Sequence, residues 1–160
     1  MIKPTIFQPC GPLPHKYNVR LGNFLYPSEF ACQCGCGTAN IHWLVWYCCQ
    51  QIRDKFGPVI INSACRCYIH NQMIGGSPDS DHSHNPAWAA DIAVPGTSSL
   101  VVASFAETLD SIKRIGTYYQ GGRNGENGFC HVGVVDRGPG SFRRWRVNPN
   151  GTIIESIPSS

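Results

Sequence analysis

The chain has 160 residues, which is enough for one domain with a hydrophobic core and short for two. Only 14% of the residues are charged and 42% are hydrophobic, with 17 Gly and 12 Pro, so the composition excludes a disordered chain and favours a loop-rich α+β globule. The net charge of +3 includes no long Lys/Arg block, which argues against a nucleic-acid-binding protein.

The first half of the chain predicts an irregular arm, a helix and a strand. Residues 1–27 are rich in Pro and Gly and lack periodicity, so we expect an irregular N-terminal arm. Apolar residues recur at helical spacing over residues 41–56, with Asn40 placed as the N-cap and Gly57 as the stop, which predicts an amphipathic helix. The β-branched run 59–62 predicts a short buried strand that leads into a loop.

The second half predicts a polar loop, a second helix and further strands. Residues 75–86 are turn formers and polar groups, which is typical of an exposed functional loop, and 91–94 read as a strand. Helical spacing predicts a helix over 99–112. Three antiparallel strands separated by Gly-rich turns are expected over residues 114–119, 129–135 and 142–147. Residues 148–160 are expected to form a loosely held tail, which leaves 28–147 as the folded domain.

Two segments contain residue types that bind zinc. The string HSHNPAWAAD holds His82, His84 and Asp91, and FCHVGV holds His131. A catalytic zinc site uses three His or carboxylate ligands and leaves the fourth position to water. A loop histidine and an aspartate at the start of the next strand can converge, and a histidine in a neighbouring strand can approach from the side. Taken singly, His131 also reads as a half-buried strand residue and Asp91 as a cap.

Four motifs in order carry a family resemblance: SEFACQCGCG, PVIINSACRCYIHN, GGSPDSDHSHNPAWAADIAVPG, and FCHVGV followed by RRW. They resemble the zinc peptidases of the D-Ala-D-Ala carboxypeptidase type, especially the phage and viral branch, over roughly residues 28–145. The resemblance implies the small α+β fold shared with hedgehog signalling domains, a small antiparallel sheet with helices packed on it. It also implies a Zn²⁺ cofactor bound by the His and Asp of an S-x-H-x-x-G-x-A-x-D signature and by a later strand histidine.

The resemblance carries over residue by residue. Asp91 matches the aspartate ligand, His131 matches the later histidine, and Arg66 matches an arginine that binds the substrate carbonyl or carboxylate. The first histidine has two candidates: His84 keeps the family's distance to the aspartate, whereas His82 keeps the Ser-x-His pairing. Metal geometry constrains the His-to-Asp path more tightly than the loop before it, so we favour His84 and keep His82 as the alternative.

The chain departs from the family pattern at the positions of the general base, the group that takes a proton from the water molecule. Many relatives carry a carboxylate three residues before the last histidine, and closer relatives carry one two residues after it, where this chain has Gly128 and Gly133. The remaining candidates are Glu126 and Asp136, five residues to either side of His131, and the histidine of the HSH pair that is not a ligand.

These residues and the resemblance predict a zinc-dependent peptidase that hydrolyses amide bonds in peptidoglycan peptides, as a D-Ala-D-Ala carboxypeptidase or an endolysin-like endopeptidase. The alternative is a catalytically weak zinc-binding module that recognises the cell wall or a protein partner. We expect a monomer with no nucleic-acid partner. The sequence shows neither an apolar run long enough for a membrane span nor a signal peptide, so either the chain is already processed or it leaves the cell by another route. Because the expected substrate lies in the cell wall, we expect the protein to be secreted, virion-associated or released at lysis.

Nine cysteines are many for this length. Five of them fall in two clusters, a C-x-C-x-C motif and a pair that flanks the arginine, at Cys32, Cys34, Cys36, Cys65 and Cys67. The clusters could hold a structural zinc ion or form disulfides. Because C-x-C is less usual than C-x-x-C in zinc sites, we expect disulfides or free thiols here.

Overall fold

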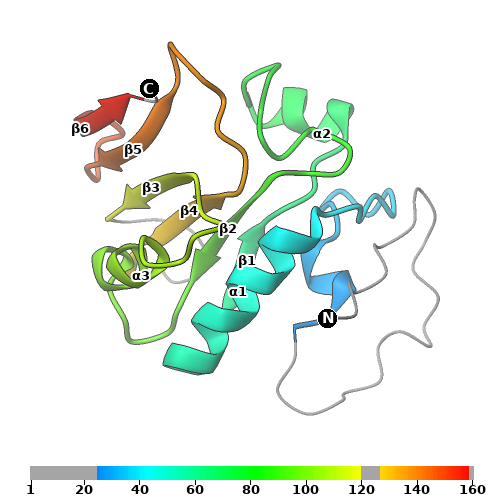
Figure 1. Ribbon diagram of the computed structural model, residues 1–160. Helices are drawn as coiled ribbons and strands as arrows, with labels where there is room; N and C mark the ends of the chain where they lie inside the picture. The colour runs from blue at the N-terminus through cyan, green and yellow to red at the C-terminus, as the bar shows by residue number, and fades with distance from the viewer. Residues whose placement is uncertain (1–24, 120–126, 159–160) are drawn as a thin grey trace.

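A computed structural model describes residues 25–119 and 127–158, so most of the expected N-terminal arm lies outside the described residues (Figure 1). In chain order the elements are η2 (Pro27–Phe30), α1 (Trp43–Phe56), β1 (Ile60–Ser63), α2 (Tyr68–Met73), β2 (Ala89–Ala93), α3 (Ser99–Ala106), β3 (Arg114–Tyr118), β4 (Phe129–Gly133), β5 (Phe142–Val147) and β6 (Ile153–Pro158). In this described part, none of the helices combines the length and the apolar character that crossing a membrane requires.

The strands form one six-stranded sheet in the order β1-β2-β4-β3-β5-β6. The helices α1 and α3 contact each other and pack against the central strands β2, β3 and β4 (Figure 1). The fold is therefore α+β, as the sequence predicts. The sheet is not purely antiparallel, because β5 pairs with β3 in parallel. The consecutive strands β4 and β5 run in opposite directions with β3 between them, and β3 is antiparallel to β4.

The C-terminal residues are more ordered than the sequence predicts. The expectation of a loosely held tail is wrong for Ile153–Pro158, which form β6 and pair with β5 in antiparallel register. A turn closed by a hydrogen bond from the Asn148 backbone N–H to the Thr152 carbonyl, at 3.0 Å, joins the two strands. The polar, Gly-containing segment before β6 is thus a hairpin turn.

Helix α1 begins two residues later than the apolar spacing suggests. Its N-cap is His42, whose Nδ1 accepts a hydrogen bond from the Leu44 backbone N–H at 3.2 Å. The expected N-cap, Asn40, instead accepts a hydrogen bond from the Ala87 backbone N–H through its own carbonyl, at 2.9 Å. This bond ties the segment before α1 to the segment that enters β2. At the other end Gly57, with φ of +91°, stops the helix as expected.

Two other helices differ from the sequence prediction. Helix α3 ends at Ala106, and residues 107–112 form turns in place of the predicted last turns of helix. Helix α2 forms where a loop was expected, with Cys67 as its N-cap: the thiol accepts a hydrogen bond from the His70 backbone N–H at 3.3 Å. This helix follows directly on the loop that carries Arg66.

The core lies between the sheet and the helices α1 and α3. Its fully buried side chains include Phe30, Ile41, Val45, Ile52, Ile92 and Val132. Strand β2 is buried along its whole length, because β1 and β4 flank it on both sides. Asp91 stands in the middle of this strand, where an ionised carboxylate is costly unless it is paired. Its surroundings therefore decide what this part of the molecule can do.

Candidate metal centre

Asp91 and His131 face each other across adjacent strands. They are direct partners in the β2–β4 register, and side chains of such pairs project from the same face of a sheet at close range. The Nδ1 atom of His131 lies 2.9 Å from Oδ1 of Asp91. Both residues are buried, at 7% and 8% exposure, so the contact is shielded from water. The strand register alone is enough to bring these two sequence-predicted ligands together.

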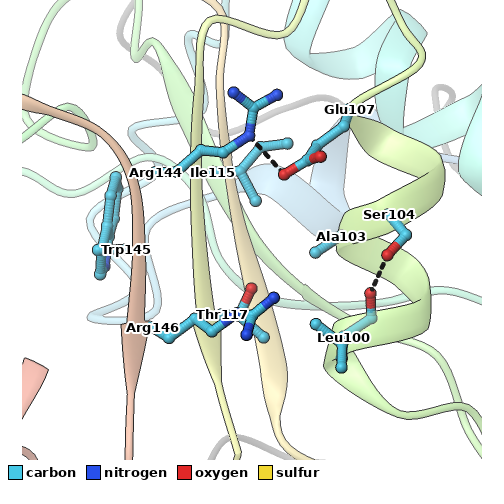
Figure 2. Close-up of a pocket in the computed structure, with 9 residues that line it drawn as sticks. All are labelled: Leu100, Ala103, Ser104, Glu107, Ile115, Thr117, Arg144, Trp145 and Arg146. Carbon is cyan, nitrogen blue, oxygen red and sulfur yellow. Dashed lines mark hydrogen bonds and ion pairs between the residues drawn. The ribbon is translucent and has the colours of Figure 1, made fainter. Parts of the chain in front are cut away.

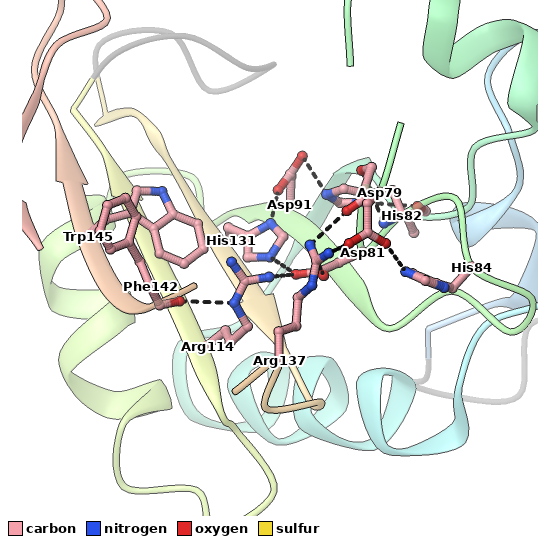
Figure 3. A network of polar contacts seen from close by, with 12 residues as sticks. Asp79, Asp81, His82, His84, Asp91, Arg114, His131, Arg137, Phe142 and Trp145 are labelled. Atoms are coloured by element: carbon pink, nitrogen blue, oxygen red, sulfur yellow. Dashed lines mark hydrogen bonds and ion pairs between the residues drawn. The ribbon is translucent and has the colours of Figure 1, made fainter. Parts of the chain in front are cut away.

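His82 completes a group of three from the loop before β2. Its side chain is buried, and its Nε2 atom lies 3.3 Å from Oδ2 of Asp91. The rings of His82 and His131 meet edge to face, with centroids 5.1 Å apart (Figure 3). One nitrogen or oxygen atom from each of the three residues lies within 4.8 Å of the others. Three side chains far apart in the sequence thus point toward one place.

The second nitrogen of each imidazole has an acceptor of its own. Nδ1 of His82 lies 2.9 Å from the Ala64 carbonyl, to which its N–H donates, so Nε2, which faces Asp91, is the nitrogen left to bind a metal ion. Nε2 of His131 lies 3.4 Å from Oδ2 of Asp81, which can accept its N–H, and Nδ1 is the nitrogen that faces Asp91. Histidines that bind a metal characteristically donate their other N–H in this way. The donor set therefore fits a zinc ion: two oriented imidazole nitrogens and one carboxylate.

Neighbouring charges and hydrogen bonds keep the Asp91 side chain ionised. Burial by itself raises the pKa of Asp91, but the charge of His82 and the hydrogen bonds from both histidines outweigh burial and hold this pKa well below its usual range. Asp91 is therefore a carboxylate at neutral pH. An anion between two imidazoles in a buried place is the arrangement that a divalent cation stabilises.

His84, the histidine favoured from the sequence, lies outside this group. Its ring stacks on Trp88 with centroids 3.5 Å apart. Its Nε2 lies 3.2 Å from Oδ1 of Asp79 (Figure 3). A backbone hydrogen bond from the Trp88 N–H to the Asp81 carbonyl, at 2.8 Å, closes residues 82–87 into a loop. The two extra residues between His82 and Asp91 are absorbed in that loop. The geometry thus favours His82 over His84: the loop brings His82 next to Asp91 in space, although His84 is nearer to Asp91 in the sequence.

Asp81 is a part of the site that sequence reasoning missed. Its carboxylate is buried, at 5% exposure, and it accepts hydrogen bonds from Arg114 and from Nη1 of Arg137, the latter at 3.3 Å. Burial raises the pKa of Asp81. The hydrogen bond and charge of His131 and the charge of Arg114 lower this pKa by more than burial raises it, so the net shift is downward. The only signal in the sequence was its place next to a ligand candidate in the string SDHSH.

The position of Asp81 accounts for one departure from the family pattern. The resemblance seen in the sequence implies an aspartate two residues after the last histidine, where this chain has Gly133. A Cβ atom built on Gly133 would lie 3.5 Å from Nε2 of His131 and 3.7 Å from Oδ2 of Asp81. The Asp81 carboxylate therefore occupies the neighbourhood toward which a side chain at position 133 would project. A carboxylate is present there, supplied by a different segment.

Arg66 is the fourth sequence-predicted residue found at the site. Its Nη2 donates a hydrogen bond to Oδ2 of Asp91 at 3.1 Å, and its Nε donates to the Ser63 hydroxyl at 2.8 Å. None of the three candidate bases is placed beside it: Asp136 is exposed and accepts a hydrogen bond from the Gly138 backbone N–H at 2.9 Å, and Glu126 lies outside the described residues. The third candidate, the histidine of the pair that is not in the group, is His84, whose ring stacks on Trp88. The prediction of Asp136 as a site residue therefore has no support from its position.

A cavity of about 380 Å³ opens over these residues. Its wall includes the three ligand candidates and three arginines, together with Asp79, Asp81 and the aromatic rings of Tyr118, Phe129 and Trp145. Gly116 makes room for the indole, because a Cβ there would lie 2.3 Å from Cε2 of Trp145. The indole in turn packs against His131, with ring centroids 5.2 Å apart.

A second cavity, of about 350 Å³, lies between α3 and the strands β3 and β5 (Figure 2). Its main polar feature is an ion pair between Nε of Arg144 and Oε1 of Glu107, at 2.5 Å. Its wall contains no histidine and no cysteine among the described residues. Of the two cavities, the first is therefore the one whose wall carries the side chains of a metal centre.

Comparison with known proteins agrees with this location. The family described as Peptidase M15 matches residues 23–133, a span that includes Arg66, His82, Asp91 and His131. Comparisons with curated proteins and with solved structures found no match. The family match covers well over half of the 160 residues. The chain therefore belongs to the Peptidase M15 family.

Proposed function

We propose that the protein is a zinc-dependent peptidase that hydrolyses amide bonds in peptidoglycan peptides. The observation that carries the proposal is the convergence of His82 Nε2, the Asp91 carboxylate and His131 Nδ1, with the other nitrogen of each imidazole held by an acceptor. These three side chains would hold the ion. When bound, zinc lowers the pKa of a water ligand and polarises the carbonyl of the scissile amide.

The net charge of the cavity favours one class of substrate. Three arginines and three aspartates line it, so their formal charges balance, and the two histidines are neutral when they act as ligands. With a divalent ion present the net charge becomes +2. A positive cavity favours peptides that carry free carboxylates, as the stem peptides of peptidoglycan do. This charge balance supports a cell-wall peptide as the substrate class.

Arg66 is the residue that we assign to substrate binding. It is a permanent cation whose guanidinium lies at the cavity wall, 3.1 Å from Asp91, and it is held there by Ser63. In that place it can pair with a terminal carboxylate of the substrate, which suits a carboxypeptidase, or offset negative charge that develops on the attacked carbonyl oxygen. Asp81 accepts the N–H of His131 and so fixes the ring orientation.

The test is the release of peptide or D-alanine from purified peptidoglycan, followed by mass spectrometry. We expect release by the zinc-loaded protein, loss of release with a chelator, and recovery when zinc is restored. His131→Ala should abolish release, and His84→Ala is the matched control that should keep it. Zinc bound at one equivalent in this cavity without any cleavage would overturn the enzyme proposal in favour of a zinc-dependent binding module. The substrate lies in the cell wall, so the proposal includes delivery by secretion, within a virion or at lysis.

A further inference from the structure

A second cluster of ligand atoms lies away from the cavity, at the start of α2. The sulfur atoms of Cys32, Cys34, Cys36 and Cys67 all lie within 4.8 Å of one another. Three of them come from the short loop after η2, and the fourth comes from the N-cap of α2. The eight cysteines in the described part of the chain are all free thiols. The peptidase chemistry proposed above uses none of these four.

The distances between the sulfur atoms suit a shared cation. Four thiolates bound to zinc at about 2.3 Å stand at the corners of a tetrahedron with edges of about 3.8 Å. Here Cys34 Sγ lies 3.3 Å from Cys32 Sγ and 3.6 Å from Cys67 Sγ. Four sulfurs gathered around one point match the geometry of a single tetrahedral ion better than that of disulfides, which join sulfurs in separate pairs.

Hydrogen-bond donors surround two of these sulfurs. The Cys67 backbone N–H donates to Cys32 Sγ at 3.4 Å, and the His70 backbone N–H donates to Cys67 Sγ at 3.3 Å. Nδ1 of the His70 ring lies 3.2 Å from Cys32 Sγ, where an N–H on that nitrogen would donate to a thiolate. Donors directed at ligand atoms are the outer partners that orient and tune a metal site.

Helix α2 also needs an attachment that apolar packing does not provide. It has six residues, far fewer than an isolated helix needs to be stable in water. Its apolar residues point to solvent, with Tyr68 at 67%, Ile69 at 68% and Met73 at 78% exposure, and Asn71 is its buried residue. The cysteine cluster at its first turn is therefore well placed to hold it.

We propose that Cys32, Cys34, Cys36 and Cys67 bind a structural zinc ion, separate from the ion of the catalytic cavity. This ion joins the loop after η2 to the N-terminus of α2. Arg66 immediately precedes Cys67, and its backbone N–H donates to the His82 carbonyl at 2.9 Å. The structural ion thus fixes the segment that presents the substrate-binding arginine to the cavity.

The experiment measures metal content by native mass spectrometry and by elemental analysis, on the full chain without added reductant. The unmodified protein should hold two zinc ions per chain, one for each cluster. His82→Ala/His131→Ala should hold one, and Cys34→Ser/Cys67→Ser should also hold one, while the buried cysteine variant Cys48→Ala should keep both. The two double variants separate this proposal from the proposed peptidase function, because each removes a different ion.

Cobalt substitution identifies the ligands even if the cysteine variant does not fold. The His82→Ala/His131→Ala protein keeps all four thiols, and its cobalt form should show thiolate-to-cobalt charge-transfer bands in the near ultraviolet. Absence of those bands, absence of zinc from this variant, or a disulfide that joins two of the four cysteines in a non-reducing peptide map would overturn the proposal.

Discussion

Replacing Asp81 by asparagine tests the role of the buried carboxylate beside the metal centre. The change keeps the size of the side chain and removes the charge that accepts the N–H of His131. Loss of such an outer partner typically lowers metal affinity about 10- to 100-fold. Because the Nε2 to Oδ2 distance of 3.4 Å is long for a hydrogen bond, we expect the lower end, about tenfold, which equals about 1.4 kcal/mol.

The same substitution also affects the two arginines that share the carboxylate. Arg137 keeps an ion pair with Asp79, and Arg114 still donates Nε to the Phe142 carbonyl at 2.9 Å, so neither loses all its partners. We therefore expect the free energy of unfolding of the metal-free protein to fall by about 1–3 kcal/mol, the range for one unsatisfied buried group. The variant should remain folded and measurable.

The assay is competition for zinc between the protein and a chromophoric chelator. Asp136→Asn is the matched control, because it removes an exposed carboxylate outside the cavity and should leave zinc affinity unchanged. If Asp81→Asn is folded and binds zinc within twofold of the unmodified protein, the carboxylate does not support His131 and the reasoning fails.

Three further predictions concern the same site. His82→Ala should weaken zinc binding by more than about 100-fold, the most that loss of a residue hydrogen-bonded to a ligand typically causes, and His84→Ala should not change zinc affinity measurably. A large loss in His84→Ala with none in His82→Ala would show that His84 is the ligand, as the sequence favoured. Gly116→Ala should lower the free energy of unfolding by about 1–3 kcal/mol in urea titrations, because its Cβ would overlap the Trp145 indole, and an unchanged midpoint would refute that packing. Burial lowers the pKa of His131, but the two neighbouring aspartates raise it overall. A proton then competes with the metal, so zinc affinity should rise with pH through neutrality, and pH-independent affinity from weakly acid to neutral solution would contradict this.

The sequence predicted the parts of the site that depend on local pattern. Asp91 and His131 fall in short β-branched runs, and strands that pair in register bring such residues face to face. The choice between His82 and His84 depended on a loop whose closure by a hydrogen bond to Trp88 is invisible in residue counts. Asp81 was missed because its role arises from contact with β4, fifty positions away in sequence.

The sequence predicted elements with a strong apolar periodicity, but it did not predict the parallel pairing of β5 with β3 or the strand β6. Helix α1 and its stop at Gly57 follow from apolar spacing and one glycine. The parallel pairing of β5 with β3 could not be read from the sequence, because neighbouring strands along the chain usually pair antiparallel and here β3 intervenes. Strand β6 was missed because its segment follows an Asn- and Gly-containing turn near the chain end, where a loosely held tail is the usual expectation.

An anomalous-scattering map at the zinc edge, from crystals of the zinc-loaded protein, is the sharpest test of the proposed metal centre. We expect a peak in the cavity that contacts His82 Nε2, the Asp91 carboxylate and His131 Nδ1. A map with no peak among these three side chains, or with the cavity peak on His84, would contradict it.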